Sequence, residues 1–187
     1  QLLQHGRHVI TQKMVQTGCQ TIADDIITHR KLMGIELQPC DMQGLTMPHI
    51  FPYPCSPHLA SRLAGQVIDL KHISNTTQQL QQQFDTVLIE GAGGLYVPLT
   101  DEIFIIDYIQ QQGYPIILVT SGKLGSINHT ILSLEAIKNC QLQLAAVIYN
   151  QIHDSQDEII AQESQRFLQH YIKQHFPHTQ WAILPKI

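Results

Sequence analysis

The sequence contains 187 residues, of which 43% are hydrophobic and 14% are charged. This length and composition are typical of one globular domain, or of two small ones, with a hydrophobic core. The 11 Lys and Arg residues are outnumbered by 15 Asp and Glu residues, which gives a formal charge of -4. We therefore expect no nucleic-acid partner and no membrane partner. The longest apolar stretches, such as residues 115–119, are far shorter than the roughly 20 residues of a membrane helix.

The four cysteines show no C-x-x-C spacing and are too few for a disulfide scaffold in a chain of this size. This pattern predicts reduced thiols and a cytoplasmic protein. Residues 1–6 are typical of the end of a helix closed by Gly6. We therefore expect a further segment to precede the first residue.

Strand and helix signals alternate along the chain. In the first half they predict a strand at 8–11, a loop at 13–18, a helix at 24–33, an irregular proline-rich connection at 39–57 and a Gln-rich helix from residue 75 or 76. In the second half they predict strands at 86–89, 115–120, 144–149 and 181–184, and helices at 104–112, 127–139 and 157–175. The helix at 24–33 has Ile26, Ile27 and Leu32 on one side, and Gly34 ends it.

Three of the predicted strands, at 86–89, 115–120 and 144–149, are continuous apolar runs without polar alternation. Such runs are typical of parallel strands that are buried on both faces. The alternation of strands and helices predicts a single α/β domain over residues 1–187, with a mostly parallel sheet flanked by helices on both faces. Because ligands bind at the carboxyl ends of parallel strands, we expect the functional residues directly after each strand.

The strand at 86–89 is followed by the sequence E-G-A-G-G at residues 90–94. A carboxylate at the end of a buried strand, next to glycines that let the backbone approach a ligand, favours a Mg²⁺ site beside a phosphate. The simpler interpretation is an acidic residue beside a tight glycine turn.

The strand at 115–120 leads through S-G-K-L-G-S-I-N-H, residues 121–129, into a helix. The free N–H groups and positive dipole of a helix start bind anions, and Lys123 adds a positive charge. In the alternative interpretation, Ser126 only caps the helix and Lys123 is a solvated loop residue.

Four further residues at strand ends or helix starts carry polar groups. Lys13 could lie over a transferred phosphoryl group, or be an exposed lysine. Asp24 and Asp25 open a helix, where the dipole favours carboxylates for structural reasons alone. Asn150 could bind a base edge, or begin a turn.

Two other kinds of chemistry are disfavoured. The histidines form no H-x-x-x-H or H-E-x-x-H pair, which argues against a histidine metal site. No G-x-S-x-G motif occurs, which argues against a serine nucleophile.

Four segments together resemble successive motifs of the dethiobiotin synthetase family, in the same order and spacing. They are K-M-V-Q-T-G at 13–18, S-P-H-L-A at 56–60, E-G-A-G-G-L-Y-V-P-L at 90–99 and K-L-G-S-I-N-H at 123–129. The resemblance covers residues 8 to 187. It implies an ATP-dependent cyclo-ligase of biotin biosynthesis that carboxylates 7,8-diaminononanoate with CO₂, ATP and Mg²⁺. In that reaction an N-carbamate and a mixed carbamic-phosphoric anhydride precede closure of the ureido ring.

The resemblance also implies roles for individual residues. It gives catalytic roles to Lys13 and Lys123, Mg²⁺ ligation to Asp24 and Glu90, and substrate contacts to Thr17, Gly125, Ser126 and Asn128. It gives ATP contacts to Asp24, Glu90, Gly91, Ala92, Gly93, Asn150, Gln151, Pro185, Lys186 and Ile187. Asp24 is preferred to Asp25 because it leaves Ile26 in register for the inner face of the helix. The family's substrate loop comes from the partner subunit, which implies a homodimer with its active site at the interface.

The chain departs from the family at two points. Gln151 stands where the family usually has Asp, and no G-x-x-x-x-x-G-K-T phosphate loop occurs in the sequence. We therefore expect a fragment that lacks the first strand, the phosphate loop and the C-terminal tail, and that is weak or inactive by itself. The alternative function is a nucleotide-dependent switch or binding remnant on a MinD- or ParA-like fold.

Overall fold

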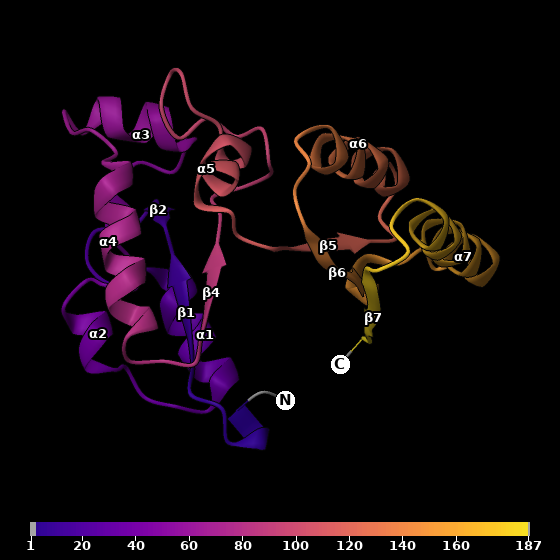
Figure 1. Ribbon diagram of the computed structural model, residues 1–187, viewed down its shortest axis with the longest axis horizontal. Helices are drawn as coiled ribbons and strands as arrows, with labels where there is room; N and C mark the ends of the chain where they lie inside the picture. Colours follow the sequence, from indigo (N-terminus) through magenta and orange to yellow (C-terminus); the bar gives the residue numbers. More distant parts are fainter. Residues whose placement is uncertain (1–2, 187) are drawn as a thin grey trace. The chain divides into compact units, whose positions relative to one another are not determined.

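The computed structural model describes residues 3–186. The chain divides into two compact units, Gln1–Tyr108 and Ile109–Ile187 (Figure 1). Both units contain parallel strands with helices packed on them, which confirms the predicted α/β fold with helix-flanked parallel sheets. The single domain predicted over residues 1–187 stays a prediction. Within residues 3–186, no helix combines the length and the apolar character needed to cross a membrane.

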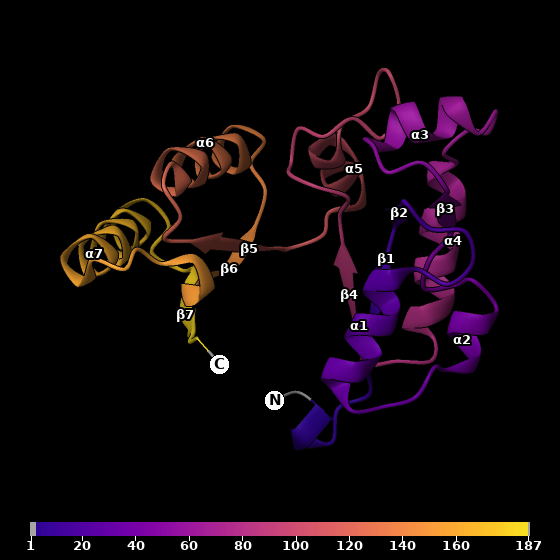
Figure 2. The ribbon, with the colours of Figure 1, turned by 180° about the vertical axis from the view of Figure 1, so that it is seen from behind.

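The N-terminal unit contains two pairs of parallel strands. Its elements are η1 (Leu3–His5), β1 (Val9–Lys13), β2 (Val15–Thr17), α1 (Asp24–Met33), α2 (Pro39–Met42), β3 (His49–Phe51), α3 (Pro57–Leu63), α4 (Leu70–Gln81), β4 (Thr86–Glu90) and α5 (Ile105–Gln112), which continues into the next unit. Strand β1 pairs with β4, and β2 pairs with β3 (Figure 2). The β1–β4 register sets Lys13 opposite Glu90, so both predicted site residues end neighbouring strands.

Helices α1 and α4 lie on opposite faces of β1. Successive residues of a strand point to opposite faces. The hydroxyl of Thr11 accepts a hydrogen bond from Arg30 of α1 at 2.8 Å. The amide oxygen of the next residue, Gln12, accepts one from the hydroxyl of Thr77 of α4 at 2.7 Å. Strand β1 is therefore buried on both sides, which fixes the position of its last residue, Lys13.

A buried ion pair joins α1 to α2. The guanidinium of Arg30 donates to both carboxylate oxygens of Asp41, at 2.7 and 2.9 Å. The hydroxyl of Thr46 donates to the same carboxylate at 2.6 Å. The side chains of Arg30 and Asp41 are 2% and 0% exposed. Because both charged groups are out of water, each depends on the other and on these hydrogen bonds.

Several predictions for the first half need correction. The predicted loop at 13–18 contains strand β2, and the predicted irregular connection at 39–57 contains α2 and β3. Proline is acceptable in the first turn of a helix, where Pro39 lies, because its missing N–H would have no partner there. The helix predicted from residue 75 or 76 begins at Leu70. Leu32 is 81% exposed, and the inward position is taken by Arg30.

The C-terminal unit is a parallel sheet of three strands in the order β5–β6–β7. Its elements are β5 (Ile116–Ser121), α6 (Ser126–Asn139), β6 (Leu144–Asn150), η2 (Gln151–His153), α7 (Glu158–His175) and β7 (Gln180–Leu184). Every predicted element of this half is present, with ends shifted by at most one residue. The strand ends at Ser121 and Asn150 are paired, so the two predicted site segments that follow them are neighbours.

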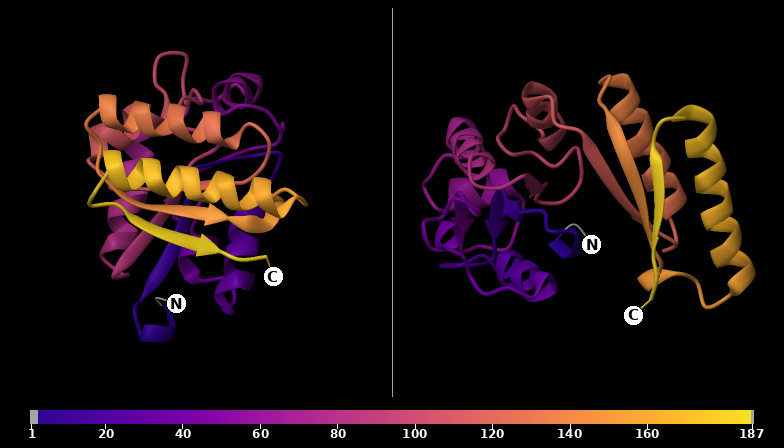
Figure 3. Two further views of the ribbon diagram at one scale, coloured as in Figure 1. Left: turned by 90° about the vertical axis from the view of Figure 1, so that its right-hand side faces the viewer. Right: turned by 60° about the horizontal axis from the view of Figure 1, so that its bottom comes forward.

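Helices α6 and α7 lie side by side on one face of this sheet (Figure 3). The hydroxyl of Tyr171 in α7 donates to the carboxylate of Glu135 in α6 at 2.6 Å. On β5, Ile117 and Val119 are 46% and 61% exposed. For the C-terminal unit taken by itself, the expectation that this strand is buried on both faces is not met. Within the C-terminal unit the two helices share one face of the sheet, so alternate residues of β5 face away from them.

Candidate active site

Lys13 lies at the end of β1 with its ammonium group between two carboxylates. Its Nζ is 2.8 Å from Asp25 Oδ2, at the start of α1, and 2.9 Å from Glu90 Oε1, at the end of β4. Nζ also donates a hydrogen bond to the carbonyl oxygen of Gly91 at 2.9 Å. The Lys13 side chain is 9% exposed, whereas those of Asp25 and Glu90 are 38% and 47% exposed. A fixed cation and two accessible carboxylates therefore meet at one strand edge.

Asp25, rather than Asp24, joins this group. Asp24 is exposed in the first turn of α1, and Ile26 is fully buried, as the predicted helix register requires. Consecutive helical residues point about 100° apart, so only one of two neighbouring aspartates can face β1. The assignment of Asp24 as a metal ligand stays a prediction, and the observed distances favour Asp25.

His29 is a member of the group that the sequence analysis missed. Its Nε2 lies 2.9 Å from Glu90 Oε2, so each carboxylate oxygen of Glu90 has a partner, one on Lys13 and one on His29. His29 follows Asp25 by four residues on α1, and residues four apart lie on the same helix face. That spacing was the available signal, but only the fold identifies the face that meets Glu90.

The glycine-rich segment after β4 passes close to other backbone and side-chain atoms. Gly93 has a φ of +96°, a conformation that favours glycine. A Cβ atom at this position would lie 2.8 Å from Val97 Cγ2. Space and backbone conformation therefore both require glycine, as expected for a turn that lets a ligand approach the backbone.

A cavity of about 370 Å³ lies beside this segment. It is lined by Lys13, Val15, Gln16, Thr17, Asp25, Cys55, Ser56, Pro57, Ala92, Gly93 and Val97. Four residues with predicted roles, Lys13, Thr17, Ala92 and Gly93, therefore share one cavity of the N-terminal unit. The positive charge of Lys13 and the hydroxyls of Thr17 and Ser56 give the cavity groups that bind anionic and polar ligands.

The predicted substrate loop of the C-terminal unit connects β5 to α6. Gly125 has a φ of +89° and directly precedes the helix. The N–H of Ser126 donates to the carbonyl oxygen of Lys123 at 2.8 Å, and the Ser126 hydroxyl lies 3.2 Å from that of Ser121. The side chains of Lys123 and Asn128 are exposed. The loop therefore presents Lys123 and the open first turn of α6 to solvent.

The predicted nucleotide-base residues follow β6 and β7. The side chain of Asn150 accepts a hydrogen bond from the N–H of Ile152 at 3.0 Å and so caps η2. Gln151 donates to Gln165 of α7 at 3.3 Å. Pro185 and Lys186 are exposed after β7. Ile187 lies outside the described residues.

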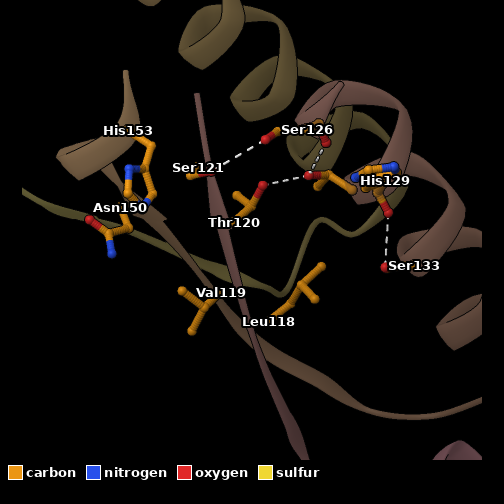
Figure 4. Close-up of a pocket in the computed structure, with 10 residues that line it drawn as sticks. Leu118, Val119, Thr120, Ser121, Ser126, His129, Ser133, Asn150 and His153 are labelled. Atoms are coloured by element: carbon orange, nitrogen blue, oxygen red, sulfur yellow. Dashed lines mark hydrogen bonds between the residues drawn. The ribbon is translucent and has the colours of Figure 1, made fainter. Parts of the chain in front are cut away.

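A second cavity, of about 320 Å³, lies at the carboxyl ends of β5 and β6 (Figure 4). It is lined by Leu118, Val119, Thr120, Ser121, Ser126, His129, Thr130, Ser133, Asn150 and His153. Ser126 and Asn150, which have predicted roles in binding substrate and ATP, are therefore brought to one cavity. Lys123, Gly125 and Asn128 do not line it.

Metal ligands were predicted at Asp24 and Glu90. In the described part of the chain, no three His, Cys, Asp or Glu side chains are grouped closely enough to hold a metal ion by themselves. The carboxylates of Asp25 and Glu90 are hard oxygen donors. Because Mg²⁺ commonly takes one or two carboxylates together with water and phosphate oxygens, this pair fits Mg²⁺ bound with a nucleotide.

Comparison with known proteins identifies the class. A family described as an AAA domain matches residues 2–187, and the chain is an α/β protein of this nucleotide-dependent class. An ATP-dependent dethiobiotin synthetase of Pasteurella multocida is 50% identical over 186 residues, which are 100% of this chain and 87% of the relative. Relatives with the same description occur in Haemophilus ducreyi, 51% identical over 99% of this chain and 87% of the relative, and in Chlorobaculum tepidum, 47% identical over 83% of this chain and 65% of the relative. The chain belongs to the dethiobiotin synthetase family, which confirms the resemblance seen in its motifs.

Proposed function

We propose that this chain is a dethiobiotin synthetase of biotin biosynthesis. It carboxylates 7,8-diaminononanoate with CO₂ and ATP, and the products are dethiobiotin, ADP and phosphate. The observation that carries the proposal is the Lys13 ammonium between the carboxylates of Asp25 and Glu90, in a chain 50% identical to an ATP-dependent dethiobiotin synthetase. Such a group provides the fixed charges that phosphoryl transfer requires.

The reaction joins phosphoryl transfer to acyl transfer. One amine of the substrate adds to CO₂ and loses a proton, which gives an N-carbamate. A carbamate oxygen attacks the γ-phosphorus of ATP, the bond from that phosphorus to the bridging oxygen breaks, and ADP leaves. The second amine then attacks the carbonyl carbon of the mixed anhydride and loses a proton. The C–O bond to the phosphoryl group breaks, so phosphate leaves and the ureido ring closes.

Lys13 is the residue best placed to stabilise the negative charge that moves in these steps. Its ammonium group is buried and held by three oxygen atoms, so little reorganisation is needed when an anionic oxygen arrives. Thr17 lines the same cavity and can donate a hydrogen bond to the substrate. Gly91, Ala92 and Gly93 lie along the phosphates of ATP in this proposal.

Mg²⁺ fits the carboxylates beside Lys13. When bound, it would neutralise charge on the ATP phosphates. Glu90 and one aspartate of α1 would hold it, and the position of Asp25 2.8 Å from Lys13 Nζ favours Asp25 over Asp24. The other contacts would be phosphate oxygens and water.

The choice between the two aspartates is testable. We expect Asp25→Asn to raise the Mg²⁺ concentration for half-maximal phosphate release by about 10- to 100-fold, because a carboxylate ligand becomes a neutral amide. Asp24→Asn is the matched control and should shift this concentration less, since its side chain is exposed. A Mg²⁺ titration of each variant measures the difference. A larger shift for Asp24→Asn would restore the assignment from the sequence.

In this proposal the C-terminal unit binds the distal carboxylate of the substrate, and the adenine and ribose of ATP. We assign Lys123 to the active site, and Gly125, Ser126 and Asn128 to the distal carboxylate of the substrate. The start of α6 supports this assignment, because its free N–H groups favour an anion. Asn150, Gln151, Pro185, Lys186 and Ile187 would contact the adenine and ribose of ATP.

A homodimer with shared active sites completes the proposal. Leu124, Ile127 and Leu132 are 100%, 38% and 61% exposed at and beyond the start of α6, next to the proposed carboxylate site. Large apolar side chains that are exposed beside a proposed site favour a protein contact there. The free cysteines of the described chain are consistent with a reducing, cytoplasmic location. No nucleic-acid or membrane partner is proposed.

Mixed dimers test whether the active sites are shared. Lys13→Ala and Asn128→Ala subunits, each inactive alone, should regain about one quarter of the wild-type activity when they are mixed in equal amounts and allowed to exchange. Half of the dimers are then mixed, and each mixed dimer has one complete site of two. Phosphate release by the mixture is compared with that of each variant alone. If the mixture is no more active than the two variants measured alone, the active sites are not shared between subunits.

The overall function is tested by phosphate release. The sequence contains no G-x-x-x-x-x-G-K-T pattern, so the assay uses the chain of 187 residues and a version with such a segment placed before it. Each version receives ATP, Mg²⁺ and bicarbonate, with and without 7,8-diaminononanoate. We expect diamine-dependent phosphate release together with formation of dethiobiotin, detected by mass, in the version that carries the phosphate loop.

Two outcomes contradict the proposal. A folded protein that binds ATP but releases no diamine-dependent phosphate in either version is a nucleotide-dependent switch or binding protein. Phosphate release that is independent of the diamine indicates an ATPase with another substrate. Circular dichroism and ATP binding by calorimetry distinguish both outcomes from a failure to fold.

A further inference from the structure

Gly122, the first residue after β5, packs against two polar groups of the β6–α7 connection. A Cβ atom built on Gly122 would overlap the Asp154 Oδ1 atom and the Tyr149 hydroxyl, and would lie 3.0 Å from Asp154 Cγ. The φ of Gly122 is not positive, unlike that of Gly125. Lack of space, rather than backbone conformation, therefore requires glycine here.

Tyr149 and Asp154 are joined by a hydrogen bond. The Tyr149 hydroxyl donates to Asp154 Oδ1 at 2.8 Å. The Tyr149 side chain is fully buried, and its ring centre lies 5.7 Å from that of Trp181 on β7. Burial, together with the hydrogen bond and the charge of Asp154, raises the pKa of Tyr149 above its usual range, so the hydroxyl keeps its proton. The hydrogen-bonded side chains of Tyr149 and Asp154 therefore hold a fixed position beside Gly122.

The same pair fixes the segment that follows β6. Asp154 ends η2, where its backbone N–H donates to the carbonyl oxygen of Gln151 at 3.1 Å. Tyr149 directly precedes Asn150, whose backbone is held between β5 and β7. The Tyr149–Asp154 pair is thus attached to the central strand of the sheet, whereas Gly122 and the three residues that follow it belong to the loop between β5 and α6.

We infer that Tyr149 and Asp154 are positioning residues for the β5–α6 loop, residues 122–125, and that Gly122 is the contact through which they act. The inference rests on the proposed function, in which Lys123 belongs to the active site. Lys123 directly follows Gly122, so a shift of Gly122 moves the backbone that carries its ammonium group. On its other side the loop is held by the Ser126 N–H, 2.8 Å from the Lys123 carbonyl oxygen. The two contacts together fix the backbone on both sides of Lys123.

Removal and insertion of atoms at this contact give a specific test. Gly122→Ala inserts a methyl group that the pair cannot accommodate. Tyr149→Phe with Asp154→Ala removes both polar groups that the methyl group would overlap. The triple variant with all three changes should therefore accept the alanine. Asp154→Asn is the conservative control, because its amide oxygen still accepts a hydrogen bond from the Tyr149 hydroxyl.

The first measurement is backbone hydrogen exchange over residues 122–125, which does not depend on catalysis. We expect exchange at least about threefold faster in Gly122→Ala and in the Tyr149→Phe, Asp154→Ala double variant, because each breaks the contact. Asp154→Asn should exchange like the wild type. Unchanged exchange in both disrupted variants overturns the inference, whatever the enzyme activity.

The second measurement separates kcat from KM in the phosphate-release assay. We expect Gly122→Ala to lower kcat by about tenfold, while the KM for ATP changes by less than about twofold, because the backbone of Asn150 stays in the sheet. The triple variant should recover at least half of the kcat lost by Gly122→Ala. If the triple variant does not recover kcat, steric overlap at Gly122 is not the cause of the lower kcat.

The two measurements also separate this inference from the proposed function. If hydrogen exchange becomes faster but kcat is unchanged, the position of Lys123 does not affect the reaction, and the inference about Lys123 is overturned. Tyr149 and Asp154 would then still order the loop. Absence of diamine-dependent activity in the wild type contradicts the proposed function, and hydrogen exchange then decides the loop contact alone.

Discussion

Lys13→Ala should lower diamine-dependent phosphate release by roughly 10²- to 10³-fold, the effect of removing one preorganised charged or hydrogen-bonding group from a transition state. The cause is local, because Lys13 Nζ is the cation shared by Asp25, Glu90 and the Gly91 carbonyl oxygen. Without it, the two carboxylates would repel both each other and an incoming phosphate or carbamate. The loss should appear in kcat, measured by phosphate release at saturating ATP and diamine.

Two further variants make the Lys13 prediction specific. Lys13→Arg keeps the positive charge but replaces a compact ammonium by a wide planar group, so we expect little recovery in a side chain that is 9% exposed. Lys71→Ala removes an exposed lysine of α4 and should leave the rate unchanged. A Lys13→Ala enzyme that keeps more than about a third of the wild-type kcat would show that Lys13 has a structural role only.

The position of Lys13 opposite Glu90 could be predicted because it depends on strand ends alone. Parallel strands align their carboxyl ends, so a polar residue that follows each of two strands tends to meet the other. The choice of Asp25 could not be made in the same way. Asp24 and Asp25 both favour the start of a helix, and the deciding quantity is the rotation of α1 about its axis relative to β1.

Burial of Arg30 was a second feature that the pattern of apolar residues did not reveal. Periodicity placed Leu32 on the inner side of α1, yet Leu32 is 81% exposed and Arg30 is 2% exposed. A charged residue is a poor candidate for a core position unless its partner is known. The partner, Asp41, lies in a region whose prolines had suggested irregular structure. The ion pair and the helix α2 that carries Asp41 were therefore missed together.

The two faces of β5 show another feature that the apolar pattern of the sequence does not predict. Its apolar run correctly predicted a strand in a parallel sheet, but not which faces are covered. Within the C-terminal unit α6 and α7 pack on the same face, which leaves Ile117 and Val119 46% and 61% exposed. Coverage depends on how consecutive helices cross the sheet, and this is a property of topology rather than of the strand sequence.

Loss of the buried ion pair between Arg30 and Asp41 should have the largest effect on stability. We expect Asp41→Asn to lower the free energy of unfolding by about 3–5 kcal/mol, because it leaves the guanidinium of Arg30 charged and without its counter-ion in the core. The amide can accept only part of the two hydrogen bonds that Arg30 now donates, at 2.7 and 2.9 Å. Urea unfolding at pH 7, followed by circular dichroism, measures the difference. Glu163→Gln, which breaks the exposed pair with Arg166, is the matched control and should cause no measurable change.

The pH dependence of this effect follows from the pKa of Asp41. Burial raises this pKa, but hydrogen bonds from Arg30, Thr46 and the Gln38 N–H outweigh burial and hold it below the usual 3.8. The carboxylate is therefore protonated at a lower pH in the folded chain than in the unfolded one. Its contribution is fully present well above pH 3.8 and is lost as the pH falls through the folded-state pKa. The stability curves of the wild type and Asp41→Asn should thus converge in acid, and a difference that stays constant from pH 7 to pH 3 would contradict an ionic origin.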